Sequence, residues 1–422
     1  MNDRAALATL FARPDLARVL DILDGDGEET RVVGGAVRNT LMGIAVSDVD
    51  LATTAEPNVV VRRAQRAGLT VIPTGTAHGT VTVLVESKPF EVTTLRRDVT
   101  TDGRHATVVF GRDFAEDARR RDFTMNALSA SRDGALHDPV GGLSDLHARR
   151  VRFIGDARTR IREDYLRILR LFRFHAAYGE GPLDISARDA AISERQGLAT
   201  LSAERINAEI AKLLVARRAP EVVPEIAETG LLGLVLGGVA YPARFAHAVV
   251  IAGVDTDAVS RLAALIIMTK EDVSRLRERL RLSNAATRRL ERIAAMLEAC
   301  HGMRTIDDAR VDTMLFRHED RAAVRDALVM LHTDSGAADD DPNWRRAYLR
   351  AAQAPVPDLP VSGDDFLRRG VPPGRNIGAA LKTLQARWIR AGFPRDPAVL
   401  ARLVDEVVRD SGQAHSNSTL SP

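Results

Sequence analysis

Two aspartates near the start of the chain, Asp48 and Asp50, have a spacing that could hold metal ions. They lie in the apolar run 46–52, which is predicted as a strand, so both carboxylates would point to one face. Carboxylates placed in this way can bind two Mg²⁺ ions about 4 Å apart. A lone Asp-x-Asp is usually a surface feature, so a third carboxylate is expected from a neighbouring strand. Glu91 is the best candidate, because it alternates with apolar residues in the predicted strand 90–95.

Two adjacent glycines, Gly34 and Gly35, precede the aspartates, between a short strand and a helix predicted over 36–42. Without side chains they let backbone N–H groups approach a phosphate, and the start of a helix favours an anion. Arg38 lies one helical turn on and can reach that anion with its forked guanidinium. A glycine pair alone is usually a turn. The order of strand, glycine pair, helix and paired aspartates is more specific and predicts a phosphate site.

Arginines are concentrated between residues 149 and 173. The nine of them are Arg149, Arg150, Arg152, Arg158, Arg160, Arg162, Arg167, Arg170 and Arg173. Such a cluster can neutralise the phosphates of a nucleic acid, although a solvated helix face is the simpler interpretation. The formal net charge of the whole chain is only +2, so overall charge does not indicate a nucleic-acid partner.

The composition is that of an ordinary globular protein, with 45% apolar and 27% charged residues. A length of 422 residues predicts two to four domains. The single cysteine, Cys300, excludes an internal disulfide and a cysteine metal cluster. No run of about 18 apolar residues is present, so we expect a soluble, cytoplasmic protein without a membrane partner.

The pattern of apolar residues divides the chain into an α/β front and a helical back. The front has further predicted strands at 71–73 and 80–86 and a predicted helix at 59–67. From about residue 155 onward the pattern is helical. The expected helices there are 158–178, 203–216, 258–269, 283–299 and 321–332, with loops at 333–343 and 354–360.

The chain carries, in this order, the motifs GGAVR, DVD, GTAHGTV, FEVTTLRRD, RRRDFTMNAL, DPVGG, REDYLRILR and AERINAE. Their order and rough spacing resemble the class II tRNA nucleotidyltransferase and bacterial poly(A) polymerase family, which belongs to the polymerase-β-like nucleotidyltransferases. The likeness covers about residues 31–210, and a weaker one at 362–381 resembles the family's C-terminal domain.

The resemblance implies an α+β fold, in which a catalytic head with a small mixed sheet is followed by an all-α neck, body and tail. The expected bounds are 1–137 for the head, 138–215 for the neck, 216–290 for an RNA-binding body, 291–411 for an RNA-binding tail and 412–422 for a disordered end. The neck would carry the residues that select the base. DPVGG, at 138–142, resembles a hinge beyond the sheet, although a simple turn explains it equally well.

The resemblance also implies roles for individual residues. Asp48 and Asp50 resemble the metal ligands and, with Glu91, the catalytic carboxylates. The residues expected to bind triphosphate or ribose are Gly34, Gly35, Arg38, Arg121, Asp122 and Asn126. An aspartate that accepts from a 2′-OH selects ribonucleotides. The alternative for Asp122 is a helix cap.

Four residues of the neck, Glu163, Asp164, Arg167 and Arg170, resemble the family's protein template for the incoming base. Cytosine and adenine each present an amine beside a ring nitrogen, so a carboxylate can accept from the amine and a guanidinium can donate to the nitrogen. Uracil and guanine present a carbonyl where the amine should be. Glu163 would hold Arg167 in place, and Arg170 would add phosphate or base contacts. The simpler alternative is a salt-bridge ladder along one helix.

The expected activity is template-independent addition of CCA to the 3′ end of tRNA, using CTP, ATP and two Mg²⁺ ions and releasing pyrophosphate. The alternatives are a bacterial poly(A) polymerase, an enzyme that adds only CC or only A, and a noncatalytic RNA-binding protein. The oligomeric state is left open.

AERINAE, at 203–209, resembles a motif that braces the neck helices.

The chain departs from the family pattern in three places. The family usually has Asp after the first motif's arginine, where this chain has Asn39. The loop that usually reads Asp-Gly-Arg-Arg-Pro is Asp-Gly-Arg-His-Ala at 102–106, which puts the expected switch from C to A addition in doubt. The His-Asp phosphohydrolase pattern of some members is absent, and His301 and His318 are expected to be ordinary core or surface residues.

Overall fold

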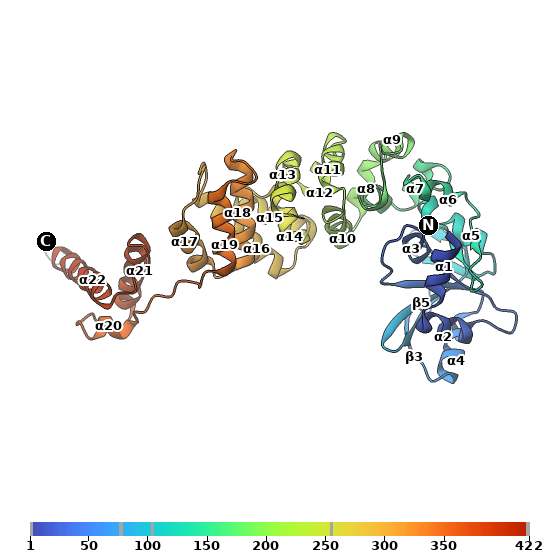
Figure 1. The fold of residues 1–422 in the computed structure, drawn as a ribbon, viewed down its shortest axis with the longest axis horizontal. Helices are drawn as coiled ribbons and strands as arrows, with labels where there is room; N and C mark the ends of the chain where they lie inside the picture. The colour runs from blue at the N-terminus through green and yellow to red at the C-terminus, as the bar shows by residue number, and fades with distance from the viewer. Residues whose placement is uncertain (1–2, 76–78, 103–104, 254–255, 419–422) are drawn as a thin grey trace. The chain divides into compact units, whose positions relative to one another are not determined.

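The computed structural model describes residues 3–75, 79–102, 105–253 and 256–418. The chain forms two compact units, Met1–Val235 and Leu236–Pro422, which are coloured blue to green and yellow to red in Figure 1. The first unit combines a sheet with helices and the second is helical, as the expected α+β fold requires. The boundary between the units falls inside the predicted segment 216–290. The finer division into head, neck, body and tail remains a prediction.

A seven-stranded mixed sheet organises the first unit, in the order β3-β4-β5-β2-β1-β8-β9. Its strands are β1 (Thr30–Val33), β2 (Val49–Thr53), β3 (Thr70–Gly75), β4 (Thr80–Val85), β5 (Lys88–Thr94), β8 (Ser129–Ala130) and β9 (Leu136–His137). Strand β2 runs antiparallel to β1 and parallel to β5. Val32, Leu51, Val83 and Phe90 from the central strands are fully buried, as alternating apolar positions require.

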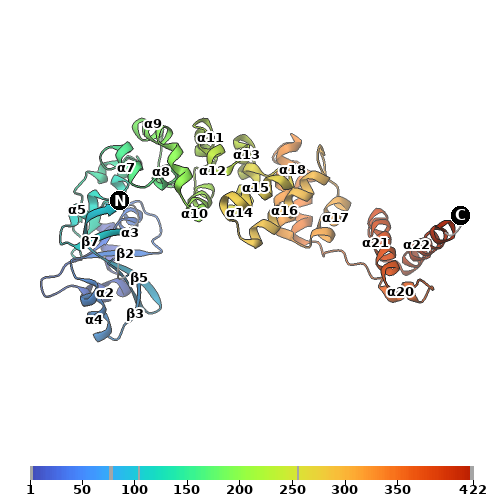
Figure 2. The same ribbon diagram turned by 180° about the vertical axis from the view of Figure 1, so that it is seen from behind.

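Five helices accompany the sheet and its edges: α1 (Asp3–Phe11), α2 (Pro14–Leu23), α3 (Gly35–Leu41), α4 (Pro57–Arg66) and α5 (Phe114–Arg119). Helix α4 packs on α2, β3 and β4, and the views from both sides place α2 and α4 beside β3 (Figures 1 and 2). It begins two residues before the predicted position because Pro57 occupies its first turn, where a missing N–H costs nothing.

A separate two-stranded sheet is made by β6 (Arg96–Asp102) and β7 (His105–Phe110). The altered loop at 102–106 falls at the turn of this hairpin. Its tip, 103–104, and residues 76–78 of GTAHGTV lie outside the described residues.

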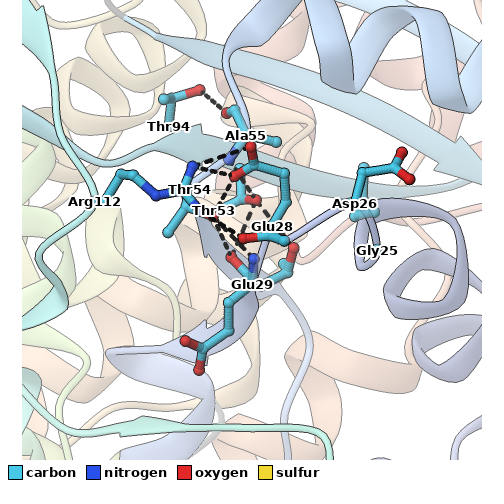
Figure 3. A network of polar contacts seen from close by, with 12 residues as sticks. Gly25, Asp26, Glu28, Glu29, Thr53, Thr54, Ala55, Thr94 and Arg112 are labelled. Atoms are coloured by element: carbon cyan, nitrogen blue, oxygen red, sulfur yellow. Dashed lines mark hydrogen bonds and ion pairs between the residues drawn. The ribbon is translucent and has the colours of Figure 1, made fainter.

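A polar network closes the ends of β1 and β2 that lie opposite the glycine pair (Figure 3). Thr30 Oγ1 donates to Thr53 Oγ1 at 3.0 Å, and Thr54 Oγ1 donates to Glu28 Oε2 at 2.5 Å. Arg112 Nη1 lies 2.8 Å from the same Glu28 oxygen. The Thr54 hydrogen bond and the Arg112 charge lower the pKa of Glu28. These bonds fix the register of the two strands that carry the candidate phosphate and metal residues.

Helices continue the first unit beyond the sheet. They are α6 (Gly142–His147), α7 (Ala157–Glu163), α8 (Leu166–Tyr178), α9 (Ile185–Ser193), α10 (Ala203–Leu214) and α11 (Ala219–Glu228), with short 3₁₀ segments at η2 (Thr124–Asn126) and η3 (Arg195–Thr200). In DPVGG, Asp138 Oδ1 accepts from the N–H of Gly142 at 2.7 Å, so this motif forms a tight turn at the start of α6. A Cβ on Gly142 would stand 2.1 Å from the Thr124 carbonyl, which explains its glycine.

The prediction of one continuous helix over 158–178 is wrong, because the chain breaks between α7 and α8. Asp164 is extended, with φ −155° and ψ 106°, and its Oδ1 accepts from the N–H of Leu166 at 3.1 Å. The Tyr165 ring packs against Gly197 of η3, where an added Cβ would lie 2.0 Å from the ring. A local carboxylate cap and a distant glycine therefore set the break, and no proline or glycine marks it in the sequence.

The second unit consists of helices. Helix α12 (Leu231–Leu236) ends at Leu236, which is the first residue of the second unit. The helices that follow are α13 (Pro242–Ala252), α14 (Ala258–Ile266), α15 (Lys270–Leu280), α16 (Asn284–Ala299), α17 (Asp308–His318), α18 (Arg321–Ser335), α19 (Pro342–Gln353), α20 (Gly363–Leu367), α21 (Arg375–Arg390) and α22 (Pro397–Ser418). Side-chain caps such as Asp257, Ser283 and Asp320 start several of them. Helix α22 extends into the segment 412–422 that was predicted to be disordered.

Within the described part of the chain, no helix combines the length and apolar character needed to cross a bilayer.

Candidate active site

The glycine pair and the aspartates lie at the same end of neighbouring strands. Strand β1 pairs with β2 in antiparallel register, Val32 opposite Leu51, so the end of β1 lies beside the start of β2. Gly34 has φ +63°, and a Cβ there would lie 2.6 Å from Arg121 Nη1. Its N–H donates to the Leu128 carbonyl at 3.0 Å and is therefore occupied. Glycine is therefore required at this position because Arg121 approaches so closely. The expected free N–H for a phosphate is not available on Gly34.

Two of the three predicted carboxylates lie on adjacent strands, and the third, Asp48, directly precedes one of them because β2 starts later than the predicted strand 46–52. Strands β2 and β5 are parallel, and Asp50 stands opposite Glu91 in their register. Asp48 lies just before β2 and accepts from Ser47 Oγ at 3.1 Å. Burial raises the pKa of Asp50, and the neighbouring charges of Glu91 and Asp48 raise it further, against the opposing charge of Arg121. Negative charge is thus concentrated where a cation would relieve it.

This carboxylate group does not form a closed metal cage. Among the described residues, no set of three or more His, Cys, Asp or Glu side chains is arranged to hold a metal ion by itself. Mg²⁺ commonly takes one or two carboxylates and completes its shell with water and substrate phosphates. Oxygen donors from Asp48 and Asp50, with Glu91 beside them, fit an ion that binds together with a nucleotide.

A cleft of about 510 Å³ opens beside Asp50 in the first unit. Its lining residues are Gly34, Gly35, Arg38, Asp50, Arg120, Arg121, Asp122, Asn126, Asp164, Leu166, Arg167, Arg170, Phe174 and Arg205. All six residues predicted to bind triphosphate or ribose are among them, as are three of the four predicted base-selecting residues. Asp48, Glu91 and Glu163 do not line it. The volume is in the usual range for a small-molecule site.

A chain of hydrogen bonds runs along the wall of this cleft. Arg38 Nη1 donates to Asn126 Oδ1 at 2.6 Å, and Asn126 Nδ2 donates to Asp122 Oδ1 at 3.0 Å. Arg170 donates to Asp122 Oδ2 from Nε at 2.8 Å and from Nη2 at 2.5 Å. The chain connects α3 to α8 through the motif that contains Asp122.

Asp122 is a buried, ionised acceptor. Burial alone would raise its pKa, but the charge of Arg170 and the hydrogen bonds from Asn126 and Arg170 hold the pKa below its usual value. Its Oδ1 also accepts from the N–H of Phe123 at 2.8 Å. The helix-cap alternative for this residue is therefore wrong, because η2 starts after Phe123 and makes no bond to the carboxylate as a cap.

Two supporting residues of the arginine pair were not predicted. Asp117 on α5 accepts from Arg120 Nε at 2.8 Å and from Arg121 Nε at 3.1 Å. Arg160 Nη2 donates to the backbone carbonyl of Arg120 at 2.5 Å and also to that of Arg121. The Asp117 contacts are local, at i,i+3 and i,i+4 spacing, so this spacing was the signal that could have identified them. The Arg160 contacts join segments about forty residues apart, so no short motif indicates them.

Ion pairs hold the residues predicted to select the base. Glu163 Oε2 lies 2.5 Å from Arg167 Nη1, which is the pair expected at this spacing. Asp164 does not pair with Arg167. Its Oδ2 lies 2.7 Å from Arg205 Nη2, on α10. Arg205 belongs to AERINAE, where the sequence suggested only bracing, and it too lines the cleft.

The arginine cluster at 149–173 is largely neutralised within the protein. Arg152, Arg158, Arg162 and Arg173 pair with Asp145, Glu194, Glu194 and Glu209 at 2.8, 3.2, 2.8 and 2.7 Å. Arg160 and Arg167 pair with Glu163, and Arg170 pairs with Asp122. Most of the cluster's charge thus has acidic partners within the protein, and its contact with the phosphates of a nucleic acid remains a prediction.

Comparison with known proteins agrees with this site. A family model described as Poly A polymerase head domain matches residues 30–152. The mitochondrial CCA tRNA nucleotidyltransferase 1 of Mus musculus is 33% identical over 392 residues, covering 90% of this chain and 87% of its own. The CCA-adding enzyme of Limosilactobacillus fermentum is 29% identical over 408 residues, covering 94% of this chain and 97% of its own.

Solved structures give the same result. The Bacillus stearothermophilus CCA-adding enzyme in complex with CTP has a TM-score of 0.73 at 26% identity, covering 96% of this chain and all of that one. The Thermotoga maritima enzyme in complex with tRNA shares the fold, with a TM-score of 0.67 at 17% identity.

Because the mouse relative is named as mitochondrial, the cytoplasmic location remains a prediction. Nucleotidyltransferases of this kind generally use divalent metal ions. From these likenesses, the chain belongs to the family of CCA-adding enzymes, the CCA tRNA nucleotidyltransferases.

Proposed function

We propose that this chain completes tRNA by adding C, C and A to its 3′ end from CTP and ATP, without a nucleic-acid template. The observation that carries the proposal is the single cleft that brings Asp50, the arginines of the predicted triphosphate site and the residues of the predicted base template together. In the reaction, the tRNA 3′-OH attacks the α-phosphate in line and pyrophosphate leaves. The relatives that carry the name of this activity match nearly the full chain.

The triphosphate is assigned to the end of the cleft near Gly34. Arg38 and Arg121 converge there from α3 and from the segment after α5. Guanidinium groups bind phosphate oxygens with paired hydrogen bonds, so they would orient the triphosphate for in-line attack. Asn126 holds Arg38 by its side-chain oxygen.

Asp122 is assigned a supporting role beside the ribose. Its two oxygens already accept from the Phe123 N–H, the Asn126 amide and two N–H groups of Arg170. These four bonds use the carboxylate's usual capacity. A ribose 2′-OH reaches Asp122 only when Arg170 shares its oxygen, so selection for ribose would depend on both residues.

The base is assigned to the other end, where Asp164 and Arg167 present an acceptor and a donor. Cytosine and adenine complement this pair, whereas uracil and guanine place a carbonyl against the Asp164 carboxylate. Glu163 fixes Arg167 by the 2.5 Å ion pair. A polar template of this type can reject bases that leave its groups unpaired.

Asp48 and Asp50, supported by Glu91, are assigned to two Mg²⁺ ions. When bound, the ions would lower the pKa of the attacking 3′-OH and neutralise charge on the leaving pyrophosphate. The residues themselves position carboxylate oxygens at the start of β2, next to the triphosphate end of the cleft.

The helices of 216–411 are assigned to tRNA contact. A reducing compartment such as the cytoplasm suits the buried thiol of Cys300.

The proposal is tested by incubating the protein with a tRNA that lacks CCA and with each nucleoside triphosphate singly and in combination, followed by sequencing of the RNA ends. Addition of CCA and then arrest is expected. A run of adenosines would identify a poly(A) polymerase, and addition of CC or A alone would identify a partial enzyme. No addition with Mg²⁺ present would favour a noncatalytic RNA-binding protein.

A further inference from the structure

Arg160 is a buried arginine of helix α7 that contacts two separate segments beside the cleft without lining it. Only 9% of its surface is exposed, and the residues that line the cleft do not include it. Its Nη2 donates to the carbonyl of Arg120 at 2.5 Å and also to that of Arg121. Its Nη1 donates to Glu163 Oε2 at 2.5 Å. One guanidinium therefore connects the segment that carries Arg121 to the helix that carries Glu163.

Arg167 closes this arrangement into a ring of hydrogen bonds. Its Nη1 donates to the same Glu163 oxygen at 2.5 Å and to the Arg160 carbonyl at 2.7 Å. Its Nη2 donates to the Arg120 carbonyl at 3.4 Å. The two arginines thus share two acceptors, one carboxylate oxygen and one backbone carbonyl. The shared carbonyl belongs to the peptide bond between Arg120 and Arg121, so both guanidinium groups hold the backbone at the predicted triphosphate-binding arginine.

The ring requires an arginine at position 160 and not only a positive charge. Burial and the charge of Arg167 lower the pKa of Arg160, whereas the charge and hydrogen bond of Glu163 oppose this shift. The carboxylate thus offsets the repulsion between the two guanidinium groups. A guanidinium is forked and can reach acceptors in different segments at once, whereas a lysine ammonium presents a single nitrogen.

A second contact joins the same parts of the chain at the next residue. Arg170 donates to Asp122 Oδ2 from Nε at 2.8 Å and from Nη2 at 2.5 Å. Arg121 is itself oriented by Asp117, which accepts from its Nε at 3.1 Å. Loss of the Arg160 fork would therefore leave both ends of the cleft formed, and would loosen their placement relative to each other.

We propose that Arg160 is a positioning residue that couples the two ends of the nucleotide site, because it holds the Arg121 backbone and the Glu163–Arg167 pair in one fixed arrangement. The inference rests on the proposed function, in which Arg121 binds the triphosphate and Arg167 reads the base. A ligand that occupies both ends gains from a fixed spacing between them, since less freedom of the protein is lost on binding. A ligand that occupies one end gains nothing from that spacing.

The test compares a ligand of both ends with a ligand of one end. CTP occupies both, whereas inorganic pyrophosphate occupies the triphosphate end alone. Each is titrated calorimetrically into the full chain in the presence of Mg²⁺. Arg160→Lys keeps a charge beside Glu163 and loses the fork. We expect it to weaken CTP by about ten-fold, the value of one charged hydrogen bond, and pyrophosphate by less than about two-fold.

A role for Arg160 as a counter-charge alone predicts a different result, because lysine supplies the same charge. Arg160→Lys would then bind CTP as the wild type does. Steady-state assays add a second measurement, the ratio of kcat/KM for CTP to that for UTP. This ratio should fall by about three- to ten-fold in Arg160→Lys, since a loosened template rejects the wrong base less strictly. Arg160→Gln should change both measurements in the same direction.

The matched control is Arg244→Lys, on α13 in the second unit. Arg244 is also 9% exposed, donates to the backbone carbonyl of Ile267 at 2.9 Å and lies 3.6 Å from Asp334. Its affinity for CTP and for pyrophosphate should equal that of the wild type. Thermal melting reports the folding of every variant. A partly unfolded variant has fewer sites for both ligands alike, so the ratio of its two affinities is still a valid measurement.

Wild-type affinity for CTP in Arg160→Lys would overturn the inference, and so would an equal loss of affinity for CTP and pyrophosphate. A wild type that binds neither ligand would overturn it as well. The expected difference between the two ligands, in a protein that fails to extend tRNA, would sustain the inference and overturn the proposed function. Normal extension of tRNA together with unchanged affinities in Arg160→Lys would overturn the inference alone.

Discussion

At the scale of single residues, the candidate site depends on which charges are already paired. Asp122, Glu163 and Asp164 each hold an arginine, whereas Asp50 gathers negative charge with Glu91 and Asp48. Under the proposed function, the first three would orient donors for a nucleotide. The close placement of the Asp50, Glu91 and Asp48 charges is unfavourable in the absence of a cation. This is the electrostatic property expected of a metal site.

Replacement of either proposed metal ligand should stop transfer without loss of tRNA binding. Asp48→Ala and Asp50→Ala should each lower the rate of nucleotide addition by about a hundred- to thousand-fold, since charge stabilisation at the reacting phosphate is lost. Single-turnover assays with Mg²⁺ and filter binding of tRNA measure the two effects. Asp189→Ala, at an exposed aspartate paired with Arg188, is the control and should be silent. Near-normal turnover of either site variant would remove the metal role.

The raised pKa of Asp50 also leads to a prediction about the stability of the fold. Its pKa is raised in the folded chain, so folding favours the protonated form, and its contribution to stability is present at low pH and is lost as pH rises through the folded pKa. At neutral pH the ionised group is therefore destabilising when no metal is bound. Asp50→Asn should raise the melting temperature in EDTA, and Mg²⁺ should stabilise the wild type more than the variant. An equal response of both proteins to Mg²⁺ would contradict this account.

Base selectivity is the third residue-scale prediction. Asp164→Ala should lower kcat/KM for CTP and ATP by about ten- to a hundred-fold, the value of a charged hydrogen bond, and should relax rejection of UTP and GTP. The control is Arg162→Ala, which breaks an exposed pair with Glu194 of 2.8 Å. If Asp164→Ala slows all four nucleotides by one factor, the residue does not read the base.

At the scale of elements, the break between α7 and α8 sets the positions of the residues predicted to select the base. In one continuous helix, Asp164 and Arg167 would share a face. The extended backbone at Asp164 and the Tyr165 ring on Gly197 prevent this. The predicted template residues are thus positioned by a bend that packs on a 3₁₀ segment about thirty residues further along the chain.

Gly197→Ala should therefore disturb both stability and selectivity. A Cβ placed 2.0 Å from the Tyr165 ring forces that ring or the bend to move, and overpacking of this kind costs about 1–3 kcal/mol. Urea unfolding and kcat/KM for the four nucleotides measure the two effects. Gly233→Ala is the control, because a Cβ there meets nothing within 4 Å. Unchanged unfolding in Gly197→Ala would show that the ring contact is unimportant.

Strands β1 to β5 of the sheet could be predicted from the sequence, while the two-residue strands β8 and β9, the bend and several contacts could not. Alternating apolar residues identify β2, β4 and β5 and even the partner carboxylate Glu91, because strand periodicity is local. The cap that ends α7 is a single Asp–backbone bond, and the Arg205–Asp164 pair spans 41 residues. Neither leaves a periodic signal. Tyr178 was likewise missed, since its contact with Arg38 exists only once α8 lies against the sheet domain.

At the scale of the whole molecule, basic and acidic residues nearly balance, at 59 and 57. Most of the arginine cluster is paired internally, with several members still about half exposed. The dissociation constant for tRNA should still rise with salt, by about ten- to a thousand-fold between 50 and 200 mM, through release of counter-ions. Filter binding across this range provides the measurement. A flat dependence would contradict an electrostatic RNA surface.

The pair between Asp164 and Arg205 has a consequence for the empty enzyme. Before any nucleotide arrives, each oxygen of Asp164 accepts one hydrogen bond, one from the Leu166 N–H and one from Arg205. A carboxylate accepts about four hydrogen bonds, so each oxygen keeps room for a further donor. A cytosine or adenine amine can add to these contacts, whereas a uracil or guanine carbonyl repels the carboxylate. Arg205 would then hold the acceptor still within the chain, so that every candidate base meets the same carboxylate geometry at the moment of entry.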